Sequence, residues 1–338
     1  MAEYQVRPLN NQEYPVWDEF VKTSLTGTIF HQTMWLDASG EEFTIYGCFR
    51  ESELVGGIPI VYRSKWRLMY TFCPSLTPYL GIVFQNSKSK YVNRLSREKE
   101  ISRALAAEIK KHFHLINFNF SPLFADLQPF LWEAFSAGLR YTYLLGLNNL
   151  AKVWEEADAK RRNDITRAIK DGLHVENNCD FSSFFALVEK TFARQEKSAT
   201  FRDAAFRYNA ALEKAGRCRA FVTRNAQGEA IAGVYIIWDE KRCYYLLGGY
   251  DPEQSHHGGS ALAMWEAIRF TKNELGLDEF DFEGSMVPQI EQFFRKFGSR
   301  LTPYYTVSWT KPGIDVIQGG LATFRNAKKF LKILFSGQ

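Results

Sequence analysis

The chain of 338 residues is long enough for two domains with buried cores, and 46% hydrophobic with 24% charged residues is the composition of a soluble globular protein. The net charge of +4 is small but unevenly placed: residues 160–170 carry five basic side chains against one acid, and residues 325–332 carry four against none. Five scattered cysteines without CxxC spacing argue against a zinc site or a disulfide framework. No signal-like start and no apolar run of about 18 residues is present, so we expect a cytoplasmic protein.

Two stretches of the chain repeat one pattern. Residues 49–70 (FRESELVGGIPIVYRSKWRLMY) and residues 224–247 (RNAQGEAIAGVYIIWDEKRCYYLL) both give a polar turn, a Glu, a small residue followed by Gly, a run of apolar or aromatic positions and a second strand-like run. Two such runs joined by a polar turn are typical of a β-hairpin. We therefore predict that one hairpin is used twice.

A second correspondence follows each hairpin. Residues 115–145 and residues 279–309 both give a strand with alternating Phe, a helical stretch, a Gly and a further strand. Two matches in the same order favour a tandem duplication. The predicted fold class is α/β: two similar domains, each a mixed, mostly antiparallel sheet flanked by helices. We expect the first domain at 1–150, the second at 151–311 and a C-terminal segment at 312–338.

The C-terminal segment contains an amphipathic pattern from Leu321 to Phe335, with basic residues on one side. The favoured interpretation is a helix that packs back on the first domain. The alternative is peripheral contact with the cytoplasmic membrane surface, because basic amphipathic helices bind anionic lipid.

The basic segment at 160–170 has the periodicity of a helix. At about 100° per residue, Arg161 falls inside the apolar arc. The other members of that arc are Ile165, Ala168 and Ile169, and the outward positions are Lys160, Arg167 and Lys170. A buried guanidinium needs an anionic partner, which is either an internal acid or a carboxylate or phosphate of a substrate. Arg161 is therefore a candidate substrate-binding residue, and the outward basic side chains are either solvated or in contact with a nucleic-acid backbone.

A strand-like run that ends at paired glycines leads into QSHHGGS (254–260) and then into a helical pattern. Because the start of a helix exposes unpaired N–H groups and the positive end of the helix dipole, a glycine loop at this point can hold a phosphate. The candidate donor-binding residues are Gln254, His256, Gly258, Gly259 and Ser260, with Ser260 as the helix N-cap. His257 is a candidate catalytic base. The alternative is that the glycines only make tight turns and the histidines are solvated.

The segment FDFEGS (280–285) is predicted to be a strand with Phe280 and Phe282 on one face and Asp281 and Glu283 on the other. Attack of an amine on a thioester or ester requires a neutral amine, and a carboxylate at a strand end can remove its proton. Glu283 is therefore a candidate general base or amine-binding group. The alternative is an ordinary solvated acid.

The order of hairpin, strand, glycine loop, helix and strand resembles the GNAT acyltransferase fold, whose pyrophosphate loop has the form QxxGxG or RxxGxA. QSHHGGS resembles that loop, with the first Gly one place late. Further segments resemble the Fem-type peptidoglycan aminoacyltransferases and the related FemAB-like acetyltransferases, and because these segments are spread from residue 30 to residue 298, the resemblance covers nearly the whole chain. These segments are FHQTMW (30–35), GGIP (56–59), TPYLG (77–81), KRRNDITRAIKDGLHVE (160–176), FDFEGS and FFRKFG (293–298).

The resemblance implies two GNAT-like domains and transfer of an acyl group to an amine, with acetyl-CoA or another acyl-CoA as the cofactor and no metal. One position departs from the family, which often has FKxxFG with the lysine close to the reacting acyl group. This chain has Phe294 at that position, and Lys296 lies two residues further round the helix.

Three functions remain open. The first is an N-acyltransferase that moves an acyl group from acyl-CoA to an amine of an amino sugar, amino acid or peptide. The second, supported by the basic segments, is a Fem-type transferase that uses aminoacyl-tRNA and acts on a cell-wall precursor. The third, indicated by Phe294 and the imperfect loop, is a non-catalytic double-GNAT binding module. The acceptor cannot be named, but candidate acceptor-binding residues in the first half, each equally a candidate for packing, include Trp35, Arg63, Trp66, Arg67 and Tyr79.

Overall fold

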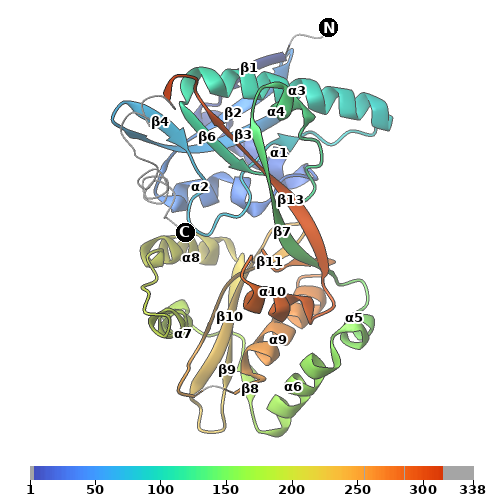
Figure 1. Ribbon diagram of the computed structural model, residues 1–338. Helices are drawn as coiled ribbons and strands as arrows, with labels where there is room; N and C mark the ends of the chain where they lie inside the picture. Colours follow the sequence, from blue (N-terminus) through green and yellow to red (C-terminus); the bar gives the residue numbers. More distant parts are fainter. Residues whose placement is uncertain (1–3, 255, 285, 315–338) are drawn as a thin grey trace. The chain divides into compact units, whose positions relative to one another are not determined.

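The computed structural model describes residues 4–254, 256–284 and 286–314. Its contacts divide the chain into two compact units (Figure 1). Unit 1 contains the described residues up to Arg140 together with those from Pro303 onward, and unit 2 runs from Tyr141 to Thr302. The helix predicted at 321–335 lies outside the described residues.

The sheet of unit 1 has the strand order β1-β2-β3-β4-β6-β13, with β5 paired to β3. Neighbouring strands are antiparallel except for β4 and β6, which are parallel. The strands are β1 (Tyr4–Pro8), β2 (Glu42–Arg50), β3 (Glu53–Lys65), β4 (Leu68–Thr71), β5 (Val83–Phe84), β6 (Leu115–Asn119) and β13 (Arg300–Thr310). The helices are η1 (Asn11–Glu13), α1 (Tyr14–Thr23), η2 (Ile29–His31), α2 (Thr33–Ser39), α3 (Tyr91–His112) and α4 (Gln128–Trp132).

The sheet of unit 2 has the strand order β8-β9-β10-β11-β12-β7. Here β11 and β12 are parallel and the other neighbours are antiparallel. The strands are β7 (Ser136–Gly146), β8 (His174–Glu176), β9 (Cys218–Arg224), β10 (Ala230–Trp238), β11 (Cys243–Tyr250) and β12 (Glu279–Asp281). The helices are α5 (Leu150–Glu156), α6 (Ala159–Lys170), α7 (Phe181–Ala193), α8 (Arg202–Ala215), α9 (Gly259–Asn273) and α10 (Pro288–Arg295).

The two sheets repeat one topology, which confirms the predicted duplication. The hairpin β2–β3 corresponds to β9–β10, and in each unit a parallel pair follows, β4 with β6 and β11 with β12. The last strand of each copy, however, pairs in the sheet of the other unit: β7 pairs with β12, and β13 pairs with β6. The unit borders therefore fall inside β7 and β13, whereas a division at 150 and 311 follows the repeat in the sequence.

Helices cover both faces of the unit 2 sheet (Figure 1). Helix α9 packs against β9 and β10, and α7 packs against β10 and β11. Neighbouring residues of β10 contact opposite helices: Ala232 lies under the start of α9, and a Cβ added at Gly233 would lie 3.0 Å from Phe184 of α7. Since side chains alternate along a strand, β10 is buried on both faces.

Helix α6 forms where the sequence predicts it. The side chain of Asp158 caps its start by accepting hydrogen bonds from the backbone N–H groups of Lys160 and Arg161. Ile165 and Ala168 are buried and Arg161 is only 6% exposed, as the predicted arc requires. The prediction is wrong for Ile169, which is 57% exposed because it lies about 100° round the helix from Ala168, outside the face that contacts α9.

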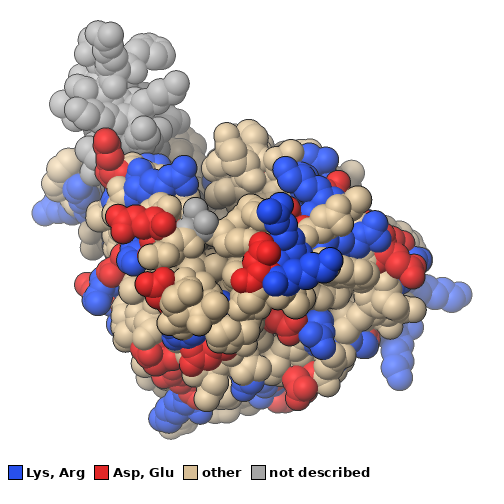
Figure 2. Space-filling model, turned by 90° about the horizontal axis from the view of Figure 1, so that it is seen from below, with Lys and Arg blue, Asp and Glu red and all other residues tan. Residues whose placement is uncertain are grey.

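The surface carries charges of both signs. On the face shown in Figure 2, Lys and Arg side chains are interspersed with Asp and Glu side chains. No helix within the described ranges has both the length and the apolar character that crossing a bilayer requires.

Candidate active site in unit 2

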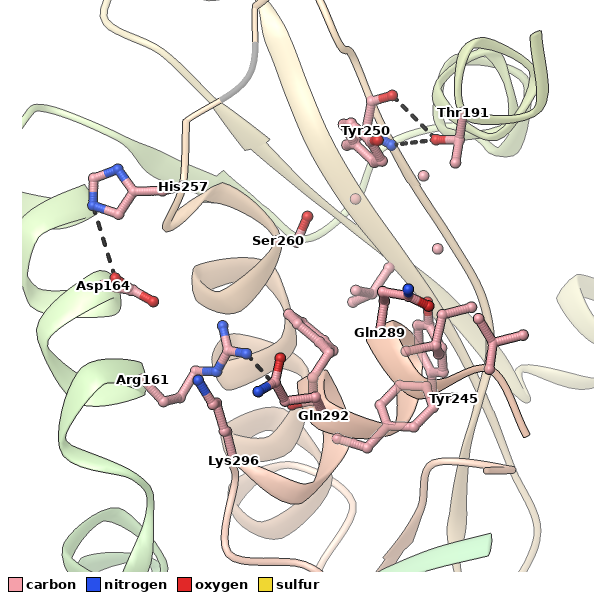
Figure 3. Close-up of a pocket in the computed structure, with 18 of the residues that line it drawn as sticks. Arg161, Asp164, Thr191, Tyr245, Tyr250, His257, Ser260, Gln289, Gln292 and Lys296 are labelled. Carbon is pink, nitrogen blue, oxygen red and sulfur yellow. Dashed lines mark hydrogen bonds and ion pairs between the residues drawn. The ribbon is translucent and has the colours of Figure 1, made fainter. Parts of the chain in front are cut away.

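Unit 2 contains a pocket of about 960 Å³ where two parallel strands separate (Figure 3). Strands β11 and β12 pair only through Cys243 with Phe280 and Tyr244 with Asp281. Beyond these pairs β11 continues to Tyr250, paired with β10 but no longer with β12, and this part of the strand lines one wall of the pocket. The other walls come from α6, α7, the start of α9 and α10. The volume lies at the upper end of the range for small-molecule sites.

The lining of the pocket is cationic. Four of its side chains are basic and one, Asp164, is acidic. The basic residues are Lys160, Arg161, Lys197 and Lys296. None of these four forms an ion pair with a residue that the structure describes, although most surface acids of unit 2 have a basic partner. An unneutralised cluster of this kind attracts an anionic ligand.

Arg161 is the most buried of these cations. Its guanidinium lies over the rings of Phe293 and Phe297, at 4.3 and 4.9 Å from the centroids. One guanidinium N–H donates to the carbonyl oxygen of Phe293 at 3.4 Å, and the buried Nε has no partner among the described residues. Burial lowers the pKa of Arg161, while the negative charges of Asp164 and Asp158 act in the opposite direction. In Figure 3 the guanidinium points into the pocket with the Lys296 ammonium beside it.

Helix α9 starts two residues earlier than predicted. Gly258 is its N-cap and Ser260 is its second residue, so the prediction of Ser260 as the N-cap is wrong. The backbone of Gly258 packs against α6 so closely that an added Cβ would lie 2.2 Å from the carbonyl oxygen of Asp164. That contact fixes the turn at Gly258. The same contact explains why a glycine is present at position 258: a larger residue would collide with α6. This is a structural role, the alternative to donor binding that the sequence analysis left open.

Only some of the backbone N–H groups at the start of α9 have hydrogen-bond partners. The N–H of Gly258 donates to Nδ1 of His256 at 3.1 Å, and the N–H of Gly259 donates to the carbonyl oxygen of His256 at 2.9 Å. The N–H groups of Ser260 and Ala261 have no hydrogen-bond partner among the described residues. Ser260, whose N–H is one of the two unpaired amides, is also a lining residue of the pocket.

The structure brings three of the predicted residues together at the pocket: Arg161, His257 and Ser260. His257 is half-exposed, and its Nε2 lies 3.9 Å from Asp164, outside hydrogen-bonding distance. Gln254 lines a separate hollow beside Lys190 and Asp251. His256, Gly258 and Gly259 lie behind Ser260 and do not line the pocket.

The other end of the pocket is apolar. Phe294, at the position of the family lysine, is buried, and its ring lies 5.5 Å from that of Tyr245 and 5.1 Å from that of Phe282. Tyr245 is the first residue of β11 beyond the segment that pairs with β12, and its hydroxyl lies so close to Gly248 that a Cβ added there would require the Tyr245 side chain to move. Burial, together with the charge of Glu283, raises the pKa of Tyr245, so the phenol keeps its proton at neutral pH.

Glu283 follows β12 in the left-handed backbone region, with φ of +55°. Its backbone N–H donates to the Asp281 carboxylate at 2.8 Å, and its buried Oε1 has no partner among the described residues. Burial, with a smaller contribution from the Asp281 charge, raises the pKa of Glu283 well above its ordinary value. Glu283 does not line the pocket directly, but its charge acts on Tyr245, which does. The solvated-acid interpretation therefore does not describe Glu283.

Trp35 and Tyr79 are core residues of unit 1. Trp35 donates its indole N–H to the Thr77 hydroxyl at 2.9 Å, and Tyr79 packs edge-on against Phe30 and Tyr304. Both are at most 1% exposed. They do not lie at the unit 2 pocket.

Sequence reasoning did not assign a role to several residues of the pocket. Tyr245 belongs to an apolar run with no motif, and Gln289 and Gln292 of α10 face the pocket from a helix that the sequence marks only by FFRKFG. The detectable signal was the position of Tyr245 three residues before the paired glycines of the strand end. Among the described residues no three His, Cys, Asp or Glu side chains come together as a metal site.

Comparison with known proteins agrees with this geometry. Residues 159–294 match the family described as "Acetyltransferase (GNAT) domain". The search of curated proteins gave no match.

Three solved structures share the fold over most of the chain. FemX has a TM-score of 0.66 at 15% identity, covering 89% of this chain and 96% of FemX. A tandem GNAT protein from the clavulanic acid biosynthesis pathway has a TM-score of 0.53 at 10% identity, with coverages of 91% and 98%. The C-terminal domain of a putative lysylphosphatidylglycerol synthetase from Agrobacterium fabrum has a TM-score of 0.54 at 13% identity, with coverages of 90% and 94%.

At such low identity these structures show the fold, and the resemblance drawn from the sequence is confirmed at that level. Residues 159–294 are therefore similar to an acetyltransferase (GNAT) domain, and the chain as a whole has the fold of a tandem GNAT protein.

Proposed function

We propose that the protein is an N-acyltransferase that takes an acyl group from acyl-CoA, bound in the unit 2 pocket, and transfers it to an amine. The proposal rests on the division of the pocket into two ends. The cations of α6 and α10 and the free amide of Ser260 suit the phosphates of the donor. The apolar end of the pocket, where β11 and β12 separate and Phe294 packs against Tyr245, suits the thioester-bearing arm of acyl-CoA.

The single observation that carries the proposal is the state of Arg161. A guanidinium that is 6% exposed, with a buried Nε that no described residue satisfies, is unfavourable in an empty pocket. An anion at this point would supply the missing hydrogen bonds. Lys296 and Lys160 would add charge without a rival acid other than Asp164.

For the chemical step we assign Glu283 as the base and Tyr245 as the proton carrier between Glu283 and the pocket. The amine attacks the thioester carbonyl, the C–N bond forms and the C–S bond breaks. The proton lost by nitrogen passes to the Tyr245 hydroxyl as Tyr245 gives its own proton to the Glu283 carboxylate. The leaving thiolate then takes a proton from the Tyr245 phenol, which regains one from Glu283. A carboxyl whose pKa is raised by burial is a stronger base once it is ionised, and this suits the role.

His257 is the second candidate base. It lines the pocket on the side of Asp164 and the start of α9, at the end that we assign to the phosphates. We therefore propose that it contacts the donor, and that Glu283 acts at the acyl group.

Acetyl-CoA is the donor to test first. The structure of the tandem GNAT protein from the clavulanic acid pathway is described as "without AcCoA", which is compatible with this choice. The test is a thermal shift of the full chain with acetyl-CoA, desulfo-CoA, a UDP-linked muropeptide and bulk tRNA, since a ligand that binds only the folded state raises the melting temperature. We expect stabilisation by acetyl-CoA, and no shift with either CoA compound would overturn the proposal.

The Fem-type alternative is favoured by the TM-score with FemX. An RNA ligand would be expected to bind a continuous basic surface. On the face shown in Figure 2 the basic side chains are mixed with acidic ones, which favours the smaller donor. Stabilisation by tRNA and not by acetyl-CoA would support this alternative, and stabilisation by none of the ligands would support the non-catalytic module.

A further inference from the structure

His256 connects the start of α9 to the end of α6. Its Nε2 lies 3.1 Å from the Asp171 carboxylate, and its Nδ1 accepts the backbone N–H of Gly258 at 3.1 Å. Its ring also stacks on that of His257, with centroids 4.3 Å apart. The imidazole is half-buried: its contact with the Gly258 amide is partly buried, and its contact with Asp171 is exposed.

These two contacts fix the tautomer of the ring. A backbone N–H can only donate, so Nδ1 of His256 carries a lone pair and no proton. An ionised carboxylate can only accept, so Nε2 carries the proton. The His256 N–H, aided by the charge of Arg167, holds the pKa of Asp171 below its usual range, and Asp171 therefore stays an acceptor at neutral pH.

The consequence concerns the amides of the loop. His256 occupies the N–H of Gly258 through its ring and the N–H of Gly259 through its carbonyl oxygen. The next N–H along the chain, that of Ser260, has no partner among the described residues, and Ser260 lines the pocket. Gly258 is buried, so removing the imidazole leaves its N–H without a partner, and the loop must rearrange to reach water.

Helix α6 organises this end of the pocket through three separate contacts. It carries Arg161, which points into the pocket, and Asp164, against which Gly258 packs. Asp171, directly after its last turn, orients His256. Helix α6 thus holds both the guanidinium of Arg161 and the turn before Ser260 in fixed positions.

We propose that His256 is a positioning residue that never contacts the ligand: its neutral imidazole locks the turn before α9 onto α6 and so directs the Ser260 amide toward the anionic part of the donor. This inference rests on the proposed function for the identity of the ligand, while the lock itself is a property of the unliganded chain.

The experiment compares His256→Ala, His256→Asn and wild type, with Arg167→Ala as the matched control. The Asn side chain can place an acceptor near the position of Nδ1 but is too short to reach Asp171. Arg167 pairs with the same Asp171 carboxylate at 3.5 Å without touching the loop. Hydrogen exchange of the peptide that covers residues 256–262 is measured on the unliganded full chain, and the Kd for acetyl-CoA is measured by calorimetry.

We expect about tenfold faster exchange and about tenfold weaker binding in His256→Ala, the effect of losing one hydrogen bond worth roughly 1.4 kcal/mol. We expect His256→Asn, which cannot reach Asp171, to recover less than half of each loss, and Arg167→Ala to match wild type. Exchange in His256→Ala within twofold of wild type, or recovery of more than half of either loss in His256→Asn, would overturn the proposal. If wild type binds no acetyl-CoA, the proposed function fails, and the exchange rates alone decide whether the lock exists.

Discussion

The two units share a topology but differ in whether the basic side chains that line their pockets form ion pairs. In unit 1 a groove of about 900 Å³ lies beside the start of α3, the counterpart of α9. Two of its three basic side chains are paired: Lys99 lies 2.6 Å from Asp126, and Arg94 lies 3.8 Å from Glu98. In unit 2 the corresponding hollow has four basic side chains without ion pairs among the described residues. This difference in ion pairing is our reason for proposing the donor site in unit 2 and not in unit 1.

The largest effect expected in unit 2 is on turnover. We expect Glu283→Gln to lower kcat by about 10²- to 10⁴-fold, the usual contribution of a general base, with little change in the donor KM. Steady-state kinetics with acetyl-CoA and an acceptor amine measure both values. Glu253→Gln, which changes an exposed acid of the preceding loop, is the control. An unchanged kcat in Glu283→Gln would remove this residue from the mechanism.

The same residue predicts a pH dependence of stability. The pKa of Glu283 is raised in the folded state, so the folded chain binds the proton more tightly than the unfolded chain does. The contribution of Glu283 to the stability of the folded state is fully present below its pKa in the unfolded chain. This contribution is lost as the pH rises through its pKa in the folded chain. We therefore expect Glu283→Gln to raise the Tm relative to wild type at pH 8 more than at pH 5. Equal differences at both pH values would show that the carboxyl is not buried as described.

The next largest effect is on donor affinity. We expect Arg161→Ala to weaken acetyl-CoA binding by about 10- to 100-fold, as for a lost hydrogen bond to a charged group. Calorimetric titration gives the Kd. Arg167→Ala on the outward face of α6 is the control within unit 2, and Arg94→Ala is the control at the unit 1 groove. The Kd of both control variants is expected to stay within twofold of wild type. A loss of affinity in Arg94→Ala equal to that in Arg161→Ala would contradict the proposal that only unit 2 binds the donor.

A smaller effect is expected on the packing that supports the site. Gly258→Ala places a Cβ within 2.2 Å of a backbone oxygen of α6, so we expect a loss of about 1–3 kcal/mol in the free energy of unfolding. Gly146 has no atom within 4 Å of an added Cβ, and Gly146→Ala is expected to change stability by less than about 0.5 kcal/mol. Urea denaturation distinguishes the two, and equal stabilities would contradict the close contact.

The smallest effect is expected in unit 1. Lys99→Gln removes a partly exposed ion pair with Asp126, which is worth less than about 1 kcal/mol, and should leave donor binding unchanged. The same urea and calorimetric measurements test it. A change in acetyl-CoA affinity would show that the unit 1 groove takes part in binding.

Local patterns predicted much of this fold. The two hairpins, the α9 helix and the burial of Arg161 follow from short-range periodicity and appear in the structure. The exchange of β7 and β13 between the sheets could not be predicted, because the partners of a strand depend on contacts between residues far apart in sequence.

The site was predictable in its chemistry more than in its geometry. The glycine loop and Arg161 pointed to an anion, but no local pattern indicated that His256 would occupy the first amides of the turn or that Gly258 serves helix packing. The sequence does not show that Tyr245 and the lysines without ion pairs share a pocket. That is apparent only once the fold brings α6, α10 and β11 together.

The most direct test of a single donor site in unit 2 is the stoichiometry of acetyl-CoA binding to the full chain, measured by isothermal titration calorimetry alongside Arg161→Ala and Arg94→Ala. We predict one site per chain, which Arg161→Ala weakens by at least about tenfold and Arg94→Ala leaves intact. Two equivalent sites per chain, or a single site that is insensitive to Arg161→Ala, would contradict it.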